Sequence, residues 1–215
     1  MLKVYDISPL ISEDLAVFPG DVKFSRNVSM DFDKDHLTLS SFETTLHLGA
    51  HTDAPNHYDP AGMGMSDRSL EYYFGKCQVI QVDCARGARI QIEDLKGKSI
   101  SSKRILFRTD SFPNPNNWNN DFVSLSSELV HHLAKHGVIL VGIDTPSIDL
   151  ADDKILESHH AVFENDMAIL EGINLSQVRE AQYLLSAIPL KIEGADASPV
   201  RAVLFEGTPE EICSK

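Results

Sequence analysis

The sequence predicts a mixed α/β fold in a single domain over residues 1–215. Three observations lead to this. A chain of 215 residues has the length of one domain. Its hydrophobic fraction of 42% and charged fraction of 24% are ordinary for a globular protein. The period of the hydrophobic pattern changes several times along the chain, which indicates strands and helices in mixed order.

The expected strands are short runs rich in Val, Ile and Leu, as in half-buried or fully buried strands. They cover residues 4–7, 37–47, 78–83, 105–109, 138–143 and 200–205.

Apolar stripes predict two helices. The first covers residues 127–136, where Gly137 is placed to end it. The second covers residues 175–186 and would bury Val178, Ala181, Leu184 and Leu185. A weaker candidate covers residues 152–158.

Two segments rich in Pro, Gly or Asn, residues 60–64 and 112–120, predict loops. Strands are expected on both sides of each loop, so neither is interpreted as a linker between domains.

Charge and cysteine content narrow the class of protein. The formal net charge of −13 argues against nucleic acid as a partner. No run of about 18 apolar residues predicts a membrane span, and residues 1–9 do not resemble a signal peptide. Cys77, Cys84 and Cys213 are odd in number and form no CxxC pair. We therefore expect a cytoplasmic protein without a disulfide framework or a cysteine-type zinc site.

The segment His-Leu-Gly-Ala-His-Thr-Asp-Ala-Pro-Asn-His, residues 47–57, gathers three histidines and a carboxylate. In an extended chain, positions 47, 51 and 53 share one face, but the run would span about 20 Å. Ligand atoms must lie about 2.0–2.2 Å from one ion, so the chain must curl. Gly49 permits this, and with Pro55 it disfavours the helical alternative. We expect the end of a strand that turns into a loop around a cation.

The donor types select the class of metal. Imidazole and carboxylate without thiolate suit Zn²⁺, Mn²⁺ or Fe²⁺, whereas Ca²⁺ and Mg²⁺ prefer oxygen alone. Three protein ligands leave an open coordination position, which is typical of a catalytic site.

A second cluster consists of His159, His160 and Glu171. Alone it would fit a solvated histidine pair and a charge at the end of a strand. Glu171 nevertheless follows an apolar run, residues 167–170, and precedes Gly172, which is an unusual place for an unpaired carboxylate.

The two clusters together resemble the metal-dependent cyclase-like hydrolases, whose signature is H-x-G-x-H-x-D-x-P-x-H. More narrowly, the chain resembles the bacterial kynurenine formamidase (arylformamidase) group. Further similar segments are residues 5–9, 18–21, 142–147, 159–161, 167–172 and 196–203.

The resemblance implies a swivelling β/β/α-type domain with a mixed sheet and flanking helices, assembled as a homodimer or a higher homo-oligomer. It also implies two divalent metal ions per subunit, Zn²⁺ by preference and Mn²⁺ as the alternative. His47, His51 and Asp53 would hold the first ion, with Asp53 bridging to the second. The remaining roles fall on His159 and Glu171 as ligands of the second ion, with His160 as a neighbour, and on His57 as the acid/base.

The implied activity is hydrolysis of N-formyl-L-kynurenine to L-kynurenine and formate in tryptophan catabolism. A metal-activated water would attack the formyl carbon, and His57 would move the proton. Two alternatives remain open: an isatin hydrolase or other cyclic-amide or lactone hydrolase, and a non-catalytic metal-dependent binding protein. A serine hydrolase is disfavoured because no G-x-S-x-G elbow occurs.

Position 18 departs from the resemblance. The formamidase group usually carries Trp before Pro-Gly-Asp, in the substrate pocket, and this chain has Phe18. A phenyl ring can still stack on an arylamine, but it lacks the indole N–H and some of the area. We expect Phe18 to bind substrate; the alternative is a core position.

Overall fold

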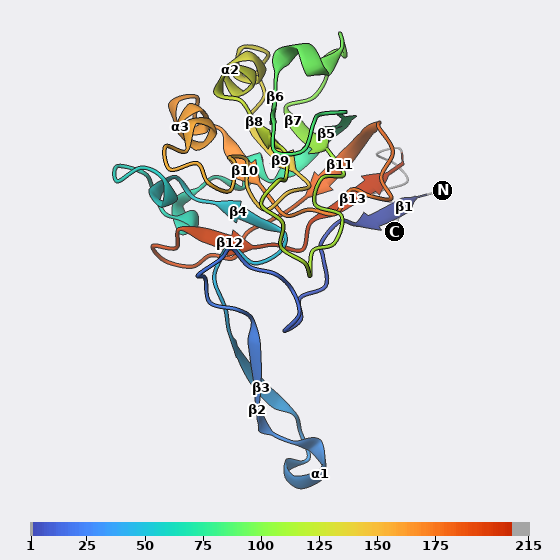
Figure 1. Cartoon of the computed structure of the whole chain (residues 1–215). Helices are drawn as coiled ribbons and strands as arrows, with labels where there is room; N and C mark the ends of the chain where they lie inside the picture. Colours follow the sequence, from blue (N-terminus) through green and yellow to red (C-terminus); the bar gives the residue numbers. More distant parts are fainter. Residues whose placement is uncertain (1, 208–215) are drawn as a thin grey trace.

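The computed structural model describes residues 2–207, and its centre is a mixed seven-stranded sheet (Figure 1). One half is parallel and the other antiparallel, and β5 joins them by pairing with β7 on one side and β11 on the other. In spatial order the strands are β1 (Lys3–Asp6), β13 (Val203–Glu206), β11 (Gln182–Ser186), β5 (Phe74–Gln81), β7 (Arg104–Arg108), β9 (Leu140–Ile143) and β10 (Ala168–Leu170).

Three two-stranded ribbons accompany this sheet. They are β4 (His51–Asp53) with β12 (Ala197–Pro199), β6 (Arg89–Ile90) with β8 (Ser124–Leu125), and β2 (Ser25–Met30) with β3 (Leu39–Glu43). The helices are α1 (Phe32–Asp35), α2 (Ser127–Lys135) and α3 (Glu157–Glu164), with the short 3-10 turns η1 (Pro55–His57), η2 (Met65–Asp67), η3 (Leu70–Tyr72) and η4 (Ile92–Leu95).

Alternation along the central strands builds a core on each face of the sheet. On β5, Val79 faces one hydrophobic cluster and Ile80 the other. The Ile80 cluster contains Leu129 of α2 and Val162 of α3, so these helices cover that face. The Val79 cluster contains residues beside β4 and β12, among them Ala54. The layers are therefore ribbon, sheet and helices, which agrees with the β/β/α arrangement that the resemblance implied.

Most sequence-based elements are confirmed. Strands occur within or beside all six expected runs, although of residues 37–47 only Leu39–Glu43 is a strand. The first helix is α2, and residues 60–64 and 112–120 are loops.

The helix expected over residues 175–186 is wrong, because residues 182–186 form strand β11 in the middle of the central sheet. Tyr183 and Leu185 are buried while Gln182 is exposed, which is the alternation of a strand. Pairing with two neighbouring strands outweighed a local pattern that also fitted a helix.

The weak helix over residues 152–158 is also wrong in position. Asp153 accepts hydrogen bonds from the backbone N–H groups of Ile155 and Leu156, which holds this segment in a turn. The helix begins only at Glu157.

Ribbon β2–β3 and α1 project from the body as a long arm (Figure 1). Every residue from 25 to 43, which we call the arm, is exposed. Phe24 anchors the base of the arm, since it packs on the small cluster of Leu15, Val17 and Leu48. The ring centroids of Phe24 and Phe42 are 5.9 Å apart.

Within residues 2–207, no helix is both long enough and apolar enough to cross a bilayer. Within the described residues, Cys77 and Cys84 form no disulfide. Cys213 lies outside these residues.

Candidate metal centre

A curled segment followed by a short strand positions the first histidine cluster. Gly49 has φ +58, and a side chain there would press on Pro9 and Leu15. His51 and Asp53 then lie on β4. The backbone N–H of His51 donates to the carbonyl of Glu171, and the N–H of Glu171 donates to the carbonyl of His51. The expected strand does end in a loop, since β3 stops at Glu43 and the loop carries His47. The expectation is wrong for His51 and Asp53, which lie on a second strand because β4 pairs with β12 from His51 onward.

His47, His51 and Asp53 converge on one point. Oδ1 of Asp53 lies 3.0 Å from Nδ1 of His47 and 3.5 Å from Nε2 of His51. This oxygen is buried, yet it accepts no hydrogen bond from any group in residues 2–207. Buried polar atoms are nearly always hydrogen-bonded, so these contacts fit atoms that share a cation better than atoms that share a proton.

The second cluster meets the first through Asp53. Its Oδ2 lies 3.3 Å from Nε2 of His159, which is 3.7 Å from Oε1 of Glu171. Oε2 of Glu171 in turn lies 3.1 Å from Nε2 of His51. Asp53 therefore belongs to two adjoining groups of possible ligands. His160 is only half-buried and belongs to none of the groups found among the described residues.

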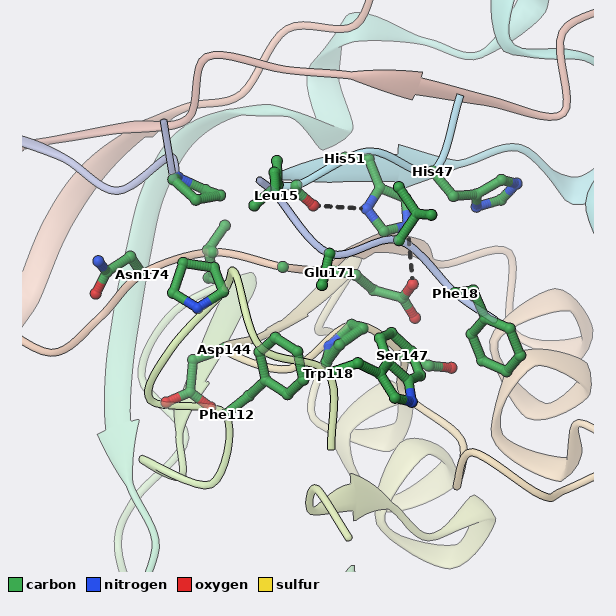
Figure 2. Close-up of a pocket in the computed structure, with 18 of the residues that line it drawn as sticks. Leu15, Phe18, His47, His51, Phe112, Trp118, Asp144, Ser147, Glu171 and Asn174 are labelled. Carbon is green, nitrogen blue, oxygen red and sulfur yellow. Dashed lines mark hydrogen bonds and ion pairs between the residues drawn. The ribbon is translucent and has the colours of Figure 1, made fainter. Parts of the chain in front are cut away.

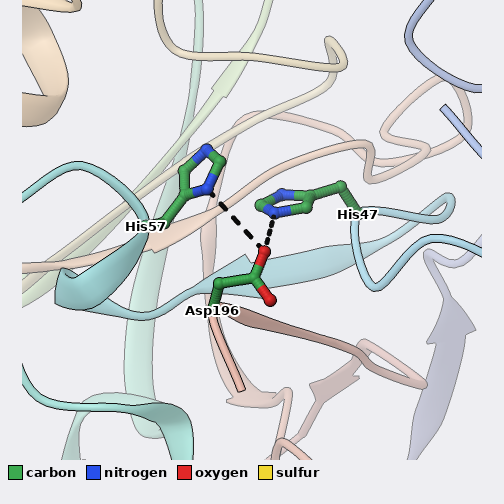
Figure 3. Close-up of side chains that lie close together, drawn as sticks. All are labelled: His47, His57 and Asp196. Atoms are coloured by element: carbon green, nitrogen blue, oxygen red, sulfur yellow. Dashed lines mark hydrogen bonds and ion pairs between the residues drawn. The ribbon is translucent and has the colours of Figure 1, made fainter. Parts of the chain in front are cut away.

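The remaining nitrogen of each of these three histidines has its own partner. Nδ1 of His51 lies 2.9 Å from the carbonyl of Gly49, and Nδ1 of His159 lies 2.7 Å from Asp149. Nε2 of His47 lies 3.0 Å from Asp196 (Figure 3). Such contacts fix the tautomer and ring orientation of histidines that ligate metals.

Asp149 is the most firmly held of these partners. It is fully buried, pairs with Arg89 at 2.6 Å, and accepts hydrogen bonds from the N–H groups of Ser158 and His159. Although burial raises the pKa of Asp149, the contacts with His159 and Arg89 lower it well below its usual range.

Sequence reasoning missed Asp149 and Asp196 as partners. Asp196 stands in one of the similar segments, residues 196–203, but nothing in the local pattern assigns it to His47. Asp149 carried no signal before the fold placed it beside His159.

The charges of the site favour a cation. Burial lowers the pKa of His47, but Asp53 reverses this and raises it to about 9. For His159, contacts with Asp149 and Asp53 likewise overcome burial and raise the pKa to about 10. Burial would raise the pKa of Asp53, yet the histidines lower it well below its usual value. The buried carboxylates thus attract positive charge, and the nitrogen and oxygen donors fit a divalent transition metal.

His57 lies at the edge of this cluster, on η1 just after Pro55. Its ring centroid is 4.2 Å from that of His47, and its Nδ1 lies 3.8 Å from Asp196 (Figure 3). Burial lowers its pKa, which favours the neutral imidazole. His47, His57 and Asp196 form a third group close enough to hold an ion.

The clusters face a cavity of about 420 Å³. Figure 2 places His47 and His51 on one side of it and Phe112 and Trp118 on the other. Phe18 also lines the cavity and is 40% exposed, so it is not a core residue. Phe112 and Trp118 come from the loop of residues 112–120, which sequence reasoning had not connected with the site.

Comparison with known proteins agrees with this geometry. Residues 5–150 match the model of the Cyclase family, described as "Putative cyclase". A kynurenine formamidase of Maricaulis maris is 39% identical over 96% of this chain and 99% of its own length. A kynurenine formamidase of Bordetella pertussis is 40% identical with the same coverage.

Solved structures share the fold. A structure described as a potential metal-dependent hydrolase with cyclase activity superposes with a TM-score of 0.84 at 26% identity, covering 97% of this chain and all of the other. Isatin hydrolase A from Labrenzia aggregata gives a TM-score of 0.79 at 20% identity, covering 95% and 93% of the two chains. At that identity the likeness shows the fold alone.

Proposed function

The chain belongs to the cyclase family, and on that premise we propose that it hydrolyses N-formyl-L-kynurenine to L-kynurenine and formate, as an arylformamidase acting on a linear amide. The observation that carries this proposal is the two-part cluster of ligand-type side chains facing an aromatic-walled cavity. Similarity of 39–40% over nearly the whole chain to proteins named kynurenine formamidase supports the same substrate.

In this proposal two divalent ions bind per subunit, Zn²⁺ by preference and Mn²⁺ as the alternative. His47, His51 and Asp53 would hold the first, and Asp53, His159 and Glu171 the second. Such ions lower the pKa of a bound water and polarise a carbonyl oxygen.

His57 would move the proton. Its side chain is one-third exposed at the edge of the cluster, so it can meet both water and substrate. The neutral imidazole takes a proton from the attacking water and returns it to the aryl nitrogen of the breaking C–N bond. The return is needed because an arylamide anion is a poor leaving group unless protonated.

The remaining side chains position either the substrate or the histidines. Phe18 and its neighbours offer ring faces to the aryl group, which leaves the formyl group toward the histidines. Asp149 and Asp196 keep His159 and His47 in the required orientation.

The test is a pair of initial-rate assays on metal-analysed protein, with N-formyl-L-kynurenine and isatin. We expect deformylation that a chelator abolishes and added Zn²⁺ restores. Rapid hydrolytic ring opening of isatin with negligible deformylation would indicate that the substrate is a cyclic amide instead. Bound metal without turnover of either would favour a binding protein.

We further propose that the chain works as a homodimer and that the arm lies in the dimer interface. Phe32 and Phe42 are 65% and 68% exposed. An isolated two-stranded ribbon is marginally stable in water, and large apolar side chains exposed along it are suited to contact with another protein. A second copy can pair with the arm isologously about a two-fold axis.

We also propose a cytoplasmic location. Cys77 and Cys84 form no disulfide within the described residues, which suits a reducing compartment.

A further inference from the structure

The only tryptophan of the chain lies in the wall of the cavity, beside the residue that departs from the formamidase pattern. The ring centroids of Trp118 and Phe18 are 5.0 Å apart with an interplanar angle of 70°. We propose that Trp118 is the specificity-determining aromatic residue of this site and supplies the large ring surface that position 18 lacks. The identity of the substrate in this inference rests on the proposed function.

Two aromatic neighbours and one hydrogen bond hold the Trp118 ring in place. Its ring packs edge-on against Phe112 at 5.8 Å and Phe122 at 5.9 Å, and Phe122 is completely buried. Its indole N–H donates to Oδ1 of Asn120 at 2.6 Å, within its own loop. The polar edge of the indole is therefore satisfied, and the surface left for the cavity is apolar.

The loops that carry Phe18 and Trp118 are joined. The N–H of Ala16 donates to the carbonyl of Pro115 at 3.0 Å, and both residues also line the cavity. This hydrogen bond links the two loops two residues before Phe18 and three before Trp118. Together with the ring contact, it supports treating Phe18 and Trp118 as one preorganised wall. Rigid aromatic contacts lose little conformational entropy when a ligand binds.

The wall stands across the cavity from the ligand groups (Figure 2). An aryl ring packed on Phe18 and Trp118 would direct its ring substituents toward His51 and Glu171. Aromatic pairs favour offset or edge-to-face packing at centroid distances of about 4.5–7 Å, and the larger indole covers more of a substituted ring than phenyl does. The wall therefore selects N-formyl arylamines over formamides without a ring.

The kinetic test compares Trp118→Ala, Trp118→Phe and the control Phe74→Ala with the wild type, all at verified metal content and melting temperature. Phe74 is an exposed aromatic residue at the start of β5, outside the cavity. For N-formyl-L-kynurenine we expect Trp118→Ala to raise KM roughly tenfold or more, with kcat changed less than about threefold. Trp118→Phe should be intermediate and Phe74→Ala unchanged.

A rescue variant separates a shared role from a merely structural one. If the two positions share one task, Phe18→Trp added to Trp118→Ala should recover most of the lost KM. A loss of loop structure in Trp118→Ala would not be repaired by a larger ring at position 18. Failure of the rescue together with a falling melting temperature would overturn the inference.

Binding without turnover keeps this inference distinct from the proposed function. Because Trp118 is the only tryptophan, its fluorescence reports on the wall alone. We expect L-kynurenine, the product, to quench this emission saturably. Quenching by L-kynurenine in a protein that does not deformylate would sink the proposed function and leave the aromatic wall intact. The inference about the wall would be wrong if the wild-type enzyme were active but showed no quenching, and if Trp118→Ala left KM unchanged.

Discussion

The candidate metal centre and the arm both depart from the usual rule that apolar side chains are buried and titratable ones exposed. The centre buries titratable side chains, and the arm exposes apolar ones. His51, Asp53, His159 and Glu171 are titratable, yet each is only 2% exposed. On the arm, the apolar residues Val28, Met30, Phe32, Leu39 and Phe42 are between 42% and 68% exposed. Buried ionisable groups and exposed large apolar patches are the informative exceptions in a folded protein. These two exceptions are the basis for the proposed metal sites and for the proposed dimer interface.

The two regions differ in how firmly the chain itself holds them. Each ligand-type histidine of the centre has a second partner, and Asp149 is fixed by four contacts. In the part of the chain that the structure describes, the arm strands β2 and β3 pair only with each other, as a separate two-stranded sheet. A preorganised centre can bind a small ion without rearrangement, whereas in the proposed dimer a second copy would support the arm.

The largest effect is expected at the carboxylate shared by both ligand groups. Asp53→Ala should lose bound metal and lower kcat/KM by roughly 10³-fold or more, because it removes an oxygen from each group. Metal analysis by mass spectrometry and initial rates measure this. Asp152→Ala, an exposed carboxylate in the turn before α3, is the matched control. A fully metallated Asp53→Ala enzyme would end the bridging assignment.

His57→Ala tests whether the neighbouring histidine belongs to the centre or acts beside it. We expect kcat to fall about 10²- to 10³-fold with metal content retained, since a proton carrier is lost but no ligand. His136→Ala, at the exposed end of α2, is the control. Loss of metal from His57→Ala would instead place His57 in the third group, with His47 and Asp196.

Asp149→Asn and Asp196→Asn test the carboxylates that contact the second ring nitrogens of His159 and His47. Asp149→Asn should weaken metal binding about 10- to 100-fold, because His159 loses the carboxylate on its Nδ1. Asp196→Asn should have a smaller effect, since that side chain is 48% exposed and water can replace it. Competition with a chromophoric chelator gives both affinities, and the reverse ranking would contradict the burial argument.

The arm should have the smallest effect on chemistry and a clear effect on assembly. Val28 and Phe42 share one face of the ribbon, since Val28 pairs with Ser40 and Phe42 with Arg26. Val28→Ser with Phe42→Ser should weaken dimerisation by roughly tenfold or more through lost apolar burial. Sedimentation at several concentrations measures it, with Ser41→Ala on the opposite face as control. A wild type that stays monomeric at every concentration would refute the dimer and the role of the arm together.

Much of the centre could be predicted because its first half is local in sequence. His47, His51 and Asp53 are separated by so few residues that donor type and a glycine between them already suggested a curled metal site. The strands were predictable for a similar reason, since runs of Val, Ile and Leu mark buried strands wherever they pair. The helix expected over residues 175–186 failed because its apolar spacing fits two periods, and only the neighbours of β11 decided between them.

The sequence by itself determined the mixed fold and the family, and it predicted the donor set and the class of metal. Those properties depend on residue types and short spacings. Only the tertiary structure decided which side chains stand behind the ligands and which complete the cavity: Asp149 behind His159, Asp196 behind His47, and Trp118 beside Phe18. The physical reason is distance along the chain, since the fold sets contacts between remote segments through strand order and loop packing, and no local pattern encodes them.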